Sequence, residues 1–147
     1  MKELLAAVKL ELQESQSLNY VRDSDIFITE HETLLPDAVS FPAVGIKDGP
    51  IRYTVATQDQ ENDTLQVKVI AYVQLQKPEA AIMGDAAAGL KGVLDVVADI
   101  RTVLKDNRLG ALADSAWPEA ETESEILATE EGQAIQMKLL TMRYERF

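Results

Sequence analysis

The chain has 147 residues, enough for one domain with a substantial core and too few for two domains of ordinary size. The absence of cysteine excludes disulfides, thiol nucleophiles and cysteine-ligated metals, and a single histidine excludes a metal site built from several. The 14 basic and 25 acidic residues give a net charge of −11, which repels DNA phosphates and anionic lipid at long range. We therefore expect a soluble acidic protein rather than an enzyme or a reader of nucleic-acid sequence.

The N-terminal apolar stretch is interrupted by Lys9 and Glu11, so it is typical of neither a secretion signal nor a membrane span. No later run approaches the ~20 apolar residues that a membrane-spanning helix needs. We expect no membrane association, and a location in the cytoplasm or in a particle assembled there.

The first predicted element is an amphipathic helix over residues 2–16, where Leu4, Val8 and Leu12 recur at helical spacing. Residues 25–29 are typical of a short strand. Pro42 has no backbone N–H, so a strand near it is expected to lie at a sheet edge or to begin after it. The next turn signal is Asp-Gly-Pro at residues 48–50, where glycine and proline favour a chain reversal.

The clearest alternation of apolar and polar residues covers segments 51–56 and 65–75, joined by the wholly polar residues 58–63. This pattern predicts an antiparallel hairpin whose second strand is about eleven residues, or ~35 Å, long. Such a strand overhangs a small sheet. We expect its edge, and that of the last strand, to be available for pairing with a neighbouring chain.

Residues 79–107 are predicted to form the main helix, whose apolar face carries Leu90, Val93, Leu94, Val97, Ile100 and Leu104. Gly89 and Gly92 inside this segment each cost a helix ~1 kcal/mol relative to alanine. Two interpretations remain open: another backbone approaches closely there, or the helix begins only after Gly89.

Residues 111–122 are predicted as a loop, 124–129 as a short strand, Glu131-Gly132 as a turn and 135–144 as a strand covered on both faces beyond Leu139. The order predicts a single α+β domain over residues 1–147. We expect a mostly antiparallel sheet of two hairpins plus an edge strand, packed by one long helix and an N-terminal helix.

Chemical motifs are weak. His31 with Asp25 and nearby carboxylates permits a metal or acid–base site, but the spacing fits no known loop, and a polar surface stretch is favoured. The segment 84–89 begins and ends with glycine, but it lacks the lysine of a phosphate-binding loop, so Asp85 is better explained as a helix N-cap. We predict no catalytic, cofactor or metal residues.

Charge is unevenly distributed. Residues 113–132 hold seven acids and no base. This indicates either a solvated loop and strand edge or an electronegative patch that faces a basic partner or keeps passing DNA from sticking. Arg101, Lys105 and Arg108 are spaced to share one helix side, either solvated or facing acids of an adjacent subunit. Trp117 either covers its own core, the favoured interpretation, or anchors an interface.

Three stretches together resemble the tail terminator (tail completion, or head-to-tail joining) proteins of tailed bacteriophages. They are FPAVGIKDG at residues 41–49, GVLDVVADI at 92–100 with the NRLG stop at 107–110, and KLLTMRYER at 138–146. The resemblance spans most of the chain through pattern and element order and contains no invariant chemical motif.

The resemblance implies a structural, non-enzymatic role. Proteins of this family form a hexameric ring that caps the tail tube, stops its polymerisation and offers a joint to the neck of the capsid. The implied partners are further copies of the chain, the tail tube, the sheath where a tail has one, and neck or connector proteins, with DNA passing through unbound. Alternatives are another neck or minor tail component, an acidic adaptor for a basic partner, and a small enzyme using Asp25 and His31.

Overall fold

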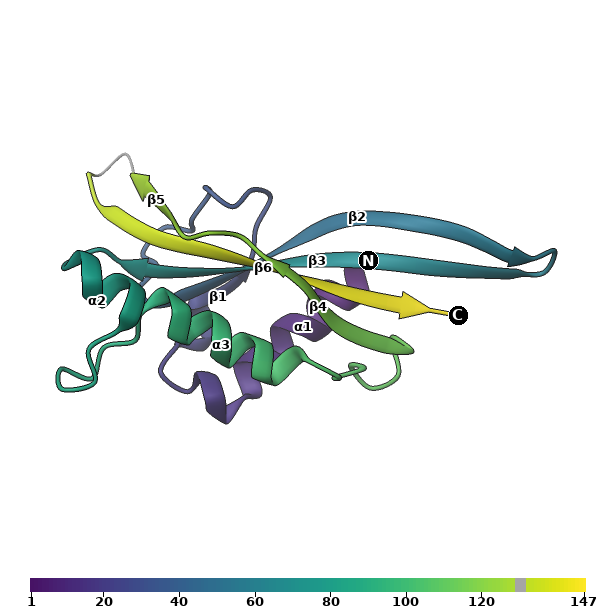
Figure 1. Ribbon diagram of the computed structural model, residues 1–147, viewed down its shortest axis with the longest axis horizontal. Helices are drawn as coiled ribbons and strands as arrows, with labels where there is room; N and C mark the ends of the chain where they lie inside the picture. The colour runs from purple at the N-terminus through teal and green to yellow at the C-terminus, as the bar shows by residue number, and fades with distance from the viewer. Residues whose placement is uncertain (129–131) are drawn as a thin grey trace.

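The computed structural model describes residues 1–128 and 132–147, and it contains a six-stranded mixed sheet with its helices packed against one face (Figure 1). The strands lie in the order β1-β2-β3-β6-β4, and β5 pairs with the other end of β6. The elements are α1 (Lys2–Glu14), the 3-10 turns η1 (Gln16–Leu18) and η2 (Asp23–Asp25), β1 (Ile26–Ile28), β2 (Ala43–Thr57), β3 (Gln60–Gln74), α2 (Pro78–Met83), α3 (Val93–Leu104), β4 (Ser115–Glu121), β5 (Glu125–Ala128) and β6 (Ala134–Arg146).

The strand pairing confirms the predicted α+β class, with β1 and β2 as the parallel pair in a sheet whose other pairs are antiparallel. It also corrects two expectations. Strand β3 lies between β2 and β6, and β6 lies between β3 and the β4 and β5 pair, so neither is a sheet edge. The alternating patterns of β3 and β6 are long because the two strands pair with each other along nearly their whole lengths, from Asp63↔Arg146 to Gln74↔Ile135.

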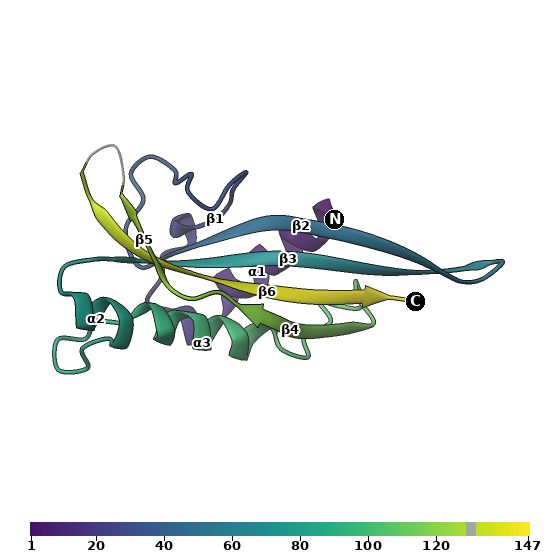
Figure 2. The same cartoon turned by 45° about the horizontal axis from the view of Figure 1, so that its top comes forward.

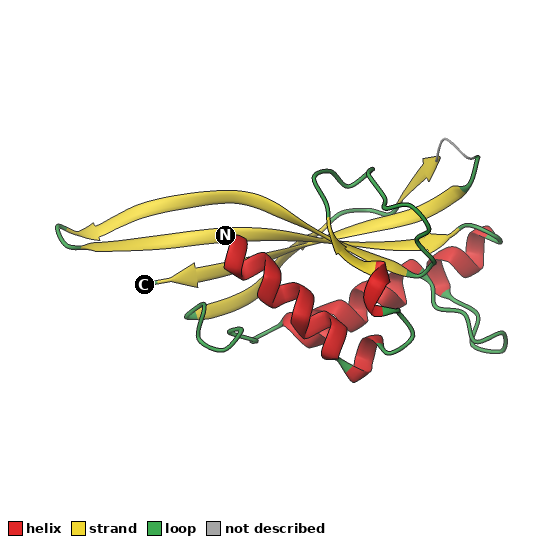
Figure 3. Cartoon of the chain, turned by 180° about the vertical axis from the view of Figure 1, so that it is seen from behind, coloured by secondary structure: helices red, strands yellow, loops and turns green. Residues whose placement is uncertain are grey.

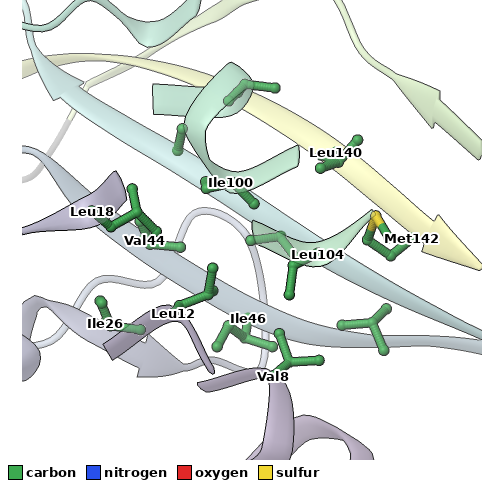
Figure 4. Close-up of a cluster of buried hydrophobic side chains, with 14 of the residues drawn as sticks. Val8, Leu12, Leu18, Ile26, Val44, Ile46, Ile100, Leu104, Leu140 and Met142 are labelled. Carbon is green, nitrogen blue, oxygen red and sulfur yellow. The ribbon is translucent and has the colours of Figure 1, made fainter. Parts of the chain in front are cut away.

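The main core lies between the sheet and the helices α1 and α3, which cover the same face (Figure 3). Helix α1 contributes Leu4, Val8 and Leu12, which are fully buried, as the helical spacing predicts. They meet side chains from α3 and alternate positions of β2, β3 and β6, among them Ile46, Ile100, Leu104, Leu140 and Met142 (Figure 4). Burying a side chain of this size stabilises the fold by roughly 1.5–3 kcal/mol, so this layer is the main source of stability.

A second, smaller core lies on the opposite face of the sheet, under the loop of residues 29–42. It contains Phe27, Ile70, Tyr72 and Ile135. Burial raises the pKa of the Tyr72 hydroxyl, which donates a hydrogen bond of 2.5 Å to the backbone oxygen of Glu32 in that loop. This core covers only one end of the face. Beyond Leu139, β6 is fully buried on its helix side and only half-buried on the other, so the predicted two-sided cover is wrong there.

The predicted helix 79–107 is two helices, α2 and α3, with a loop between them. Gly84 takes a φ of 78° and ends α2, and Gly92 is the N-cap of α3, where its N–H donates to the Asp95 carboxylate at 3.0 Å. A Cβ at Gly92 would lie 2.3 Å from the backbone oxygen of Ile82. Both interpretations therefore hold: the main helix begins after Gly89, and Gly92 permits a close backbone approach. The predicted N-cap at Asp85 is wrong.

Three loop predictions are wrong because prolines and polar residues occur inside strands. The expected turn at residues 48–50 is a bulge within β2, between the pairs Asp48↔Val67 and Ile51↔Leu65. The polar connection 58–63 shrinks to a two-residue turn, since β3 already begins at Gln60. Residues 115–121 of the expected loop form β4, where Pro118 is tolerated because the strand is at the edge and bulged.

Candidate interaction surfaces

The β2–β3 hairpin continues past the helices as a two-stranded projection, which we call the arm (residues 51–64). The arm reaches beyond both chain ends (Figures 1 and 2). Its base is the pair Ile51↔Leu65, in which Leu65 belongs to the main core and Ile51 packs against it. Next to this pair, Thr64 and Asp63 still pair with the end of β6. Farther out, no helix or third strand among the described residues lies beside the arm.

The apolar stripe of the core face runs on along the arm. Tyr53 lies opposite Asp63, and Val55 lies opposite Glu61, at alternate positions continuing from Ile51. Tyr53 is 63% exposed and Val55 is 74% exposed. Two large apolar side chains thus occupy core-type positions that nothing in the described part of the chain covers.

The arm also presents unpaired backbone. Strand β1 pairs with β2 only from Val44 to Ile46, and within residues 1–128 and 132–147 no strand pairs with the outer edge of β2 beyond that point. Free N–H and C=O groups in an extended strand are a template for adding a strand from another chain. The sequence predicts an exposed strand edge at residues 65–75, but the exposed edge belongs to β2, the strand before them.

The sheet face opposite α1 and α3 is polar wherever the small core does not cover it. We call this surface the open face, and its cations are Lys47, Arg52, Lys68 and Arg143. Gln66 of this face donates a hydrogen bond of 2.8 Å to the Glu119 carboxylate, and Arg143 forms an ion pair with Glu145. A shallow hollow of about 650 Å³ lies beside them, lined in part by Arg52, Gln66, Glu119 and Arg143.

The acidic segment 113–132 follows the opposite sheet margin, through β4, a short link and β5. Asp114 accepts a hydrogen bond from the backbone N–H of Phe147. Glu121, Glu123 and Glu125 are exposed, and we call these three residues the acidic edge. None of the ion pairs among the described residues involves them. Glu130 and Glu131 lie outside the described residues, as does one half of the turn predicted at Glu131-Gly132.

Asp25 and His31 do not share a site. Asp25 is almost fully buried; its carboxylate accepts bonds from the Arg22 side chain at 2.7 and 3.2 Å and from the Ser40 backbone N–H at 3.0 Å. Burial alone would raise the pKa of this carboxyl, but the Arg22 and Ser40 bonds outweigh burial and lower it. His31 is on the surface, with its Nδ1 2.8 Å from the Thr33 hydroxyl. This arrangement gives Asp25 a structural role.

The other charged motifs are also rearranged. Helix α3 ends at Leu104, so Arg108 is not on the same helix side as Arg101. The Lys105 ammonium lies 5.3 Å from the Trp117 ring centre, a cation–π contact. Trp117 is 54% exposed and belongs to neither core, so the expectation that it covers the core is wrong.

The segment 84–89 is part of the α2–α3 loop, where Asp85 and Leu90 form an isolated bridge. Because α3 begins only at Val93, this segment does not open a helix. In the described part of the chain no cluster of three or more His, Asp or Glu side chains is arranged to hold a metal ion. Nor does any helix there have the length and apolar character to cross a bilayer.

Comparison with protein-family models and with curated proteins finds no match to this chain.

Proposed function

We propose that the chain is a structural subunit of a tailed-bacteriophage virion, of the tail-terminator type. Copies of it form a ring, hexameric by the resemblance, that caps the tail tube, stops its polymerisation and joins it to the neck. The role requires no catalysis by the chain. The sequence likeness suggests the family, and the observation that carries the proposal is the arm.

The arm has features that a lone subunit does not need. It exposes Tyr53 and Val55 at core-type positions, and beyond Ile46 no described strand pairs with the outer edge of β2. A monomeric protein rarely keeps such a strand uncovered, because it invites pairing with other chains. A neighbouring subunit that covers the arm removes both the exposed apolar area and the free backbone groups. Contacts between unlike surfaces of identical subunits close into rings when the rotation between them permits.

The charge of the chain agrees with a channel role. A net charge of −11 repels duplex DNA, so a ring of such subunits lets DNA pass without holding it. A DNA-binding collar would need the opposite balance, with cations that replace the counterions of phosphates.

The proposal is tested by the native mass of the purified chain, measured by light scattering with and without tail tubes, and by negative-stain images. We expect a ring of about six copies, in solution or on tube ends, and virions made without the protein should carry overlong tubes. A chain that stays monomeric and ignores tube ends contradicts the proposal. Tailless heads beside normal tails would assign a connector role, and salt-sensitive binding of a monomer to a basic protein would assign an adaptor role.

A further inference from the structure

The open face of this acidic protein contains two cations, Arg52 and Lys68, that form no ion pair among the described residues, beside two that do, Lys47 and Arg143. Lys47 and Lys68 are directly opposite each other on β2 and β3 and lie on the same face of the sheet. Like charges in this position destabilise a sheet. The Lys47 ammonium is 3.7 Å from the Asp48 carboxylate, whereas Lys68 and Arg52 take part in no ion pair with any described residue.

The acidic edge carries the opposite charge on a different part of the subunit. Glu121, Glu123 and Glu125 are exposed, and no ion pair among residues 1–128 and 132–147 neutralises them. Strands β3 and β6 separate β2 from β4. Strand spacings of ~4.8 Å place β4 about 14 Å from Lys47 on β2 and about 10 Å from Lys68 on β3, both beyond the ~8 Å over which charges interact in physiological salt. The edge of one copy is thus poorly placed to neutralise its own Lys47.

We propose that the open face of one copy binds the acidic edge of a second copy, head to tail. This inference rests on the proposed ring-forming function and assigns it a contact. In this contact the carboxylates of Glu121, Glu123 and Glu125 lie against the cations around Lys47 and Lys68. Since the two surfaces are different, each copy binds one neighbour through its face and another through its edge, which is the arrangement that closes a ring.

A second copy fits the open face better than a DNA duplex does. A duplex carries a negative charge every ~1.7 Å and meets the acidic excess of the whole chain along its length. A second copy presents its carboxylates locally. None of the three forms an ion pair with a described residue, although Lys138 lies beside them and donates to the backbone oxygen of Thr122. The number of charges is also comparable: the three carboxylates face Arg52, Lys68 and Lys47, of which Lys47 already has Asp48 as a partner.

The test is a charge exchange. The face variant is Lys47→Glu with Lys68→Glu, and the edge variant is Glu123→Lys with Glu125→Lys. Each alone places like charges in contact, so we expect self-association to weaken roughly tenfold or more. A mixture of the two restores opposite charges at every contact, and we expect it to recover the native mass. The matched control for the face variant, Lys2→Glu with Lys77→Glu, makes the same two lysine-to-glutamate changes at exposed positions elsewhere and should assemble normally.

Light scattering, native mass spectrometry and circular dichroism decide the outcome. Folded single variants that dissociate and reassemble on mixing support the contact. If both variants form rings of the wild-type mass, or if their mixture fails to reassemble, the contact is wrong but the ring-forming function is not contradicted. A monomeric wild type overturns both. A fluorescent DNA duplex that binds the wild type and not the face variant, with ring mass unchanged, reassigns the cations to phosphate and overturns the proposal.

Discussion

Replacing the two apolar side chains of the arm, Tyr53→Ser with Val55→Ser, should weaken assembly without unfolding the subunit. The magnitude follows from the exposed surface. A Tyr side chain offers about 200 Å², so the 63% exposed on Tyr53 is roughly 130 Å², or ~3 kcal/mol on full burial. Full burial of a valine side chain is worth ~2 kcal/mol, so the 74% exposed on Val55 adds ~1.5 kcal/mol. Ordering the arm in the contact offsets part of this gain, and we expect about 2 kcal/mol per contact, or roughly 30-fold in Kd.

The assay is a dilution series followed by light scattering, paired with urea unfolding of the dissociated subunit. Because both side chains are exposed in the single chain, the free energy of unfolding should change by no more than about 0.5 kcal/mol. Leu10→Ser is the matched control, since Leu10 is 53% exposed on α1, away from the arm. A double variant that assembles at wild-type concentrations, or a control that dissociates equally, would refute the reasoning.

Two further predictions concern the fold. Gly92→Ala should destabilise the subunit by about 2 kcal/mol or more in urea unfolding, because the alanine Cβ would lie 2.3 Å from the backbone oxygen of Ile82. A variant with the unfolding midpoint of the wild type would show that the α2–α3 loop relaxes freely. Asp25→Ala should cost roughly 2–4 kcal/mol at pH 7 by removing charge-assisted bonds to Arg22 and Ser40. The pKa of Asp25 is lowered in the folded protein, so its contribution to stability is present above the ordinary carboxyl pKa of ~3.9. That contribution is lost as the pH falls through the folded pKa. The difference in free energy of unfolding between the wild type and the variant should therefore be smaller at pH 3 than at pH 7.

The sequence predicts the class of fold and most elements because the two periodicities are strong where one face is buried. Helix α1 and strand β6 follow their patterns closely, within two residues at each end. The errors concentrate where a local signal competes with the tertiary structure. The glycines at residues 84 and 92 break the helix that the apolar pattern continues, and prolines at 50 and 118 sit in bulged strands that pairing with neighbours maintains.

The arm is the feature that is hardest to predict, because the alternation of apolar and polar residues predicts a strand but not which strands lie beside it. The period-two pattern of residues 65–75 gives a strand but not its neighbours, and the structure places β6 beside it. Polar residues 60–63 indicate a loop by composition, yet pairing such as Val55↔Glu61 keeps them in the hairpin. The alternation at Tyr53 and Val55 is that of core positions, and only the extent of the helices shows that no described residue covers these side chains.

The arm and the open face would make contacts of different physical kinds, and this difference makes them separable. Burial of Tyr53 and Val55 depends on apolar area, which salts such as sulfate strengthen. Attraction between Lys68 and carboxylates at the surface is screened as ionic strength rises. A ring held by both should therefore loosen first at the charged contact when sodium chloride increases, while the arm variant alone should retain a salt-sensitive residual association. A single contact that carried all the binding energy would respond to salt in one direction only.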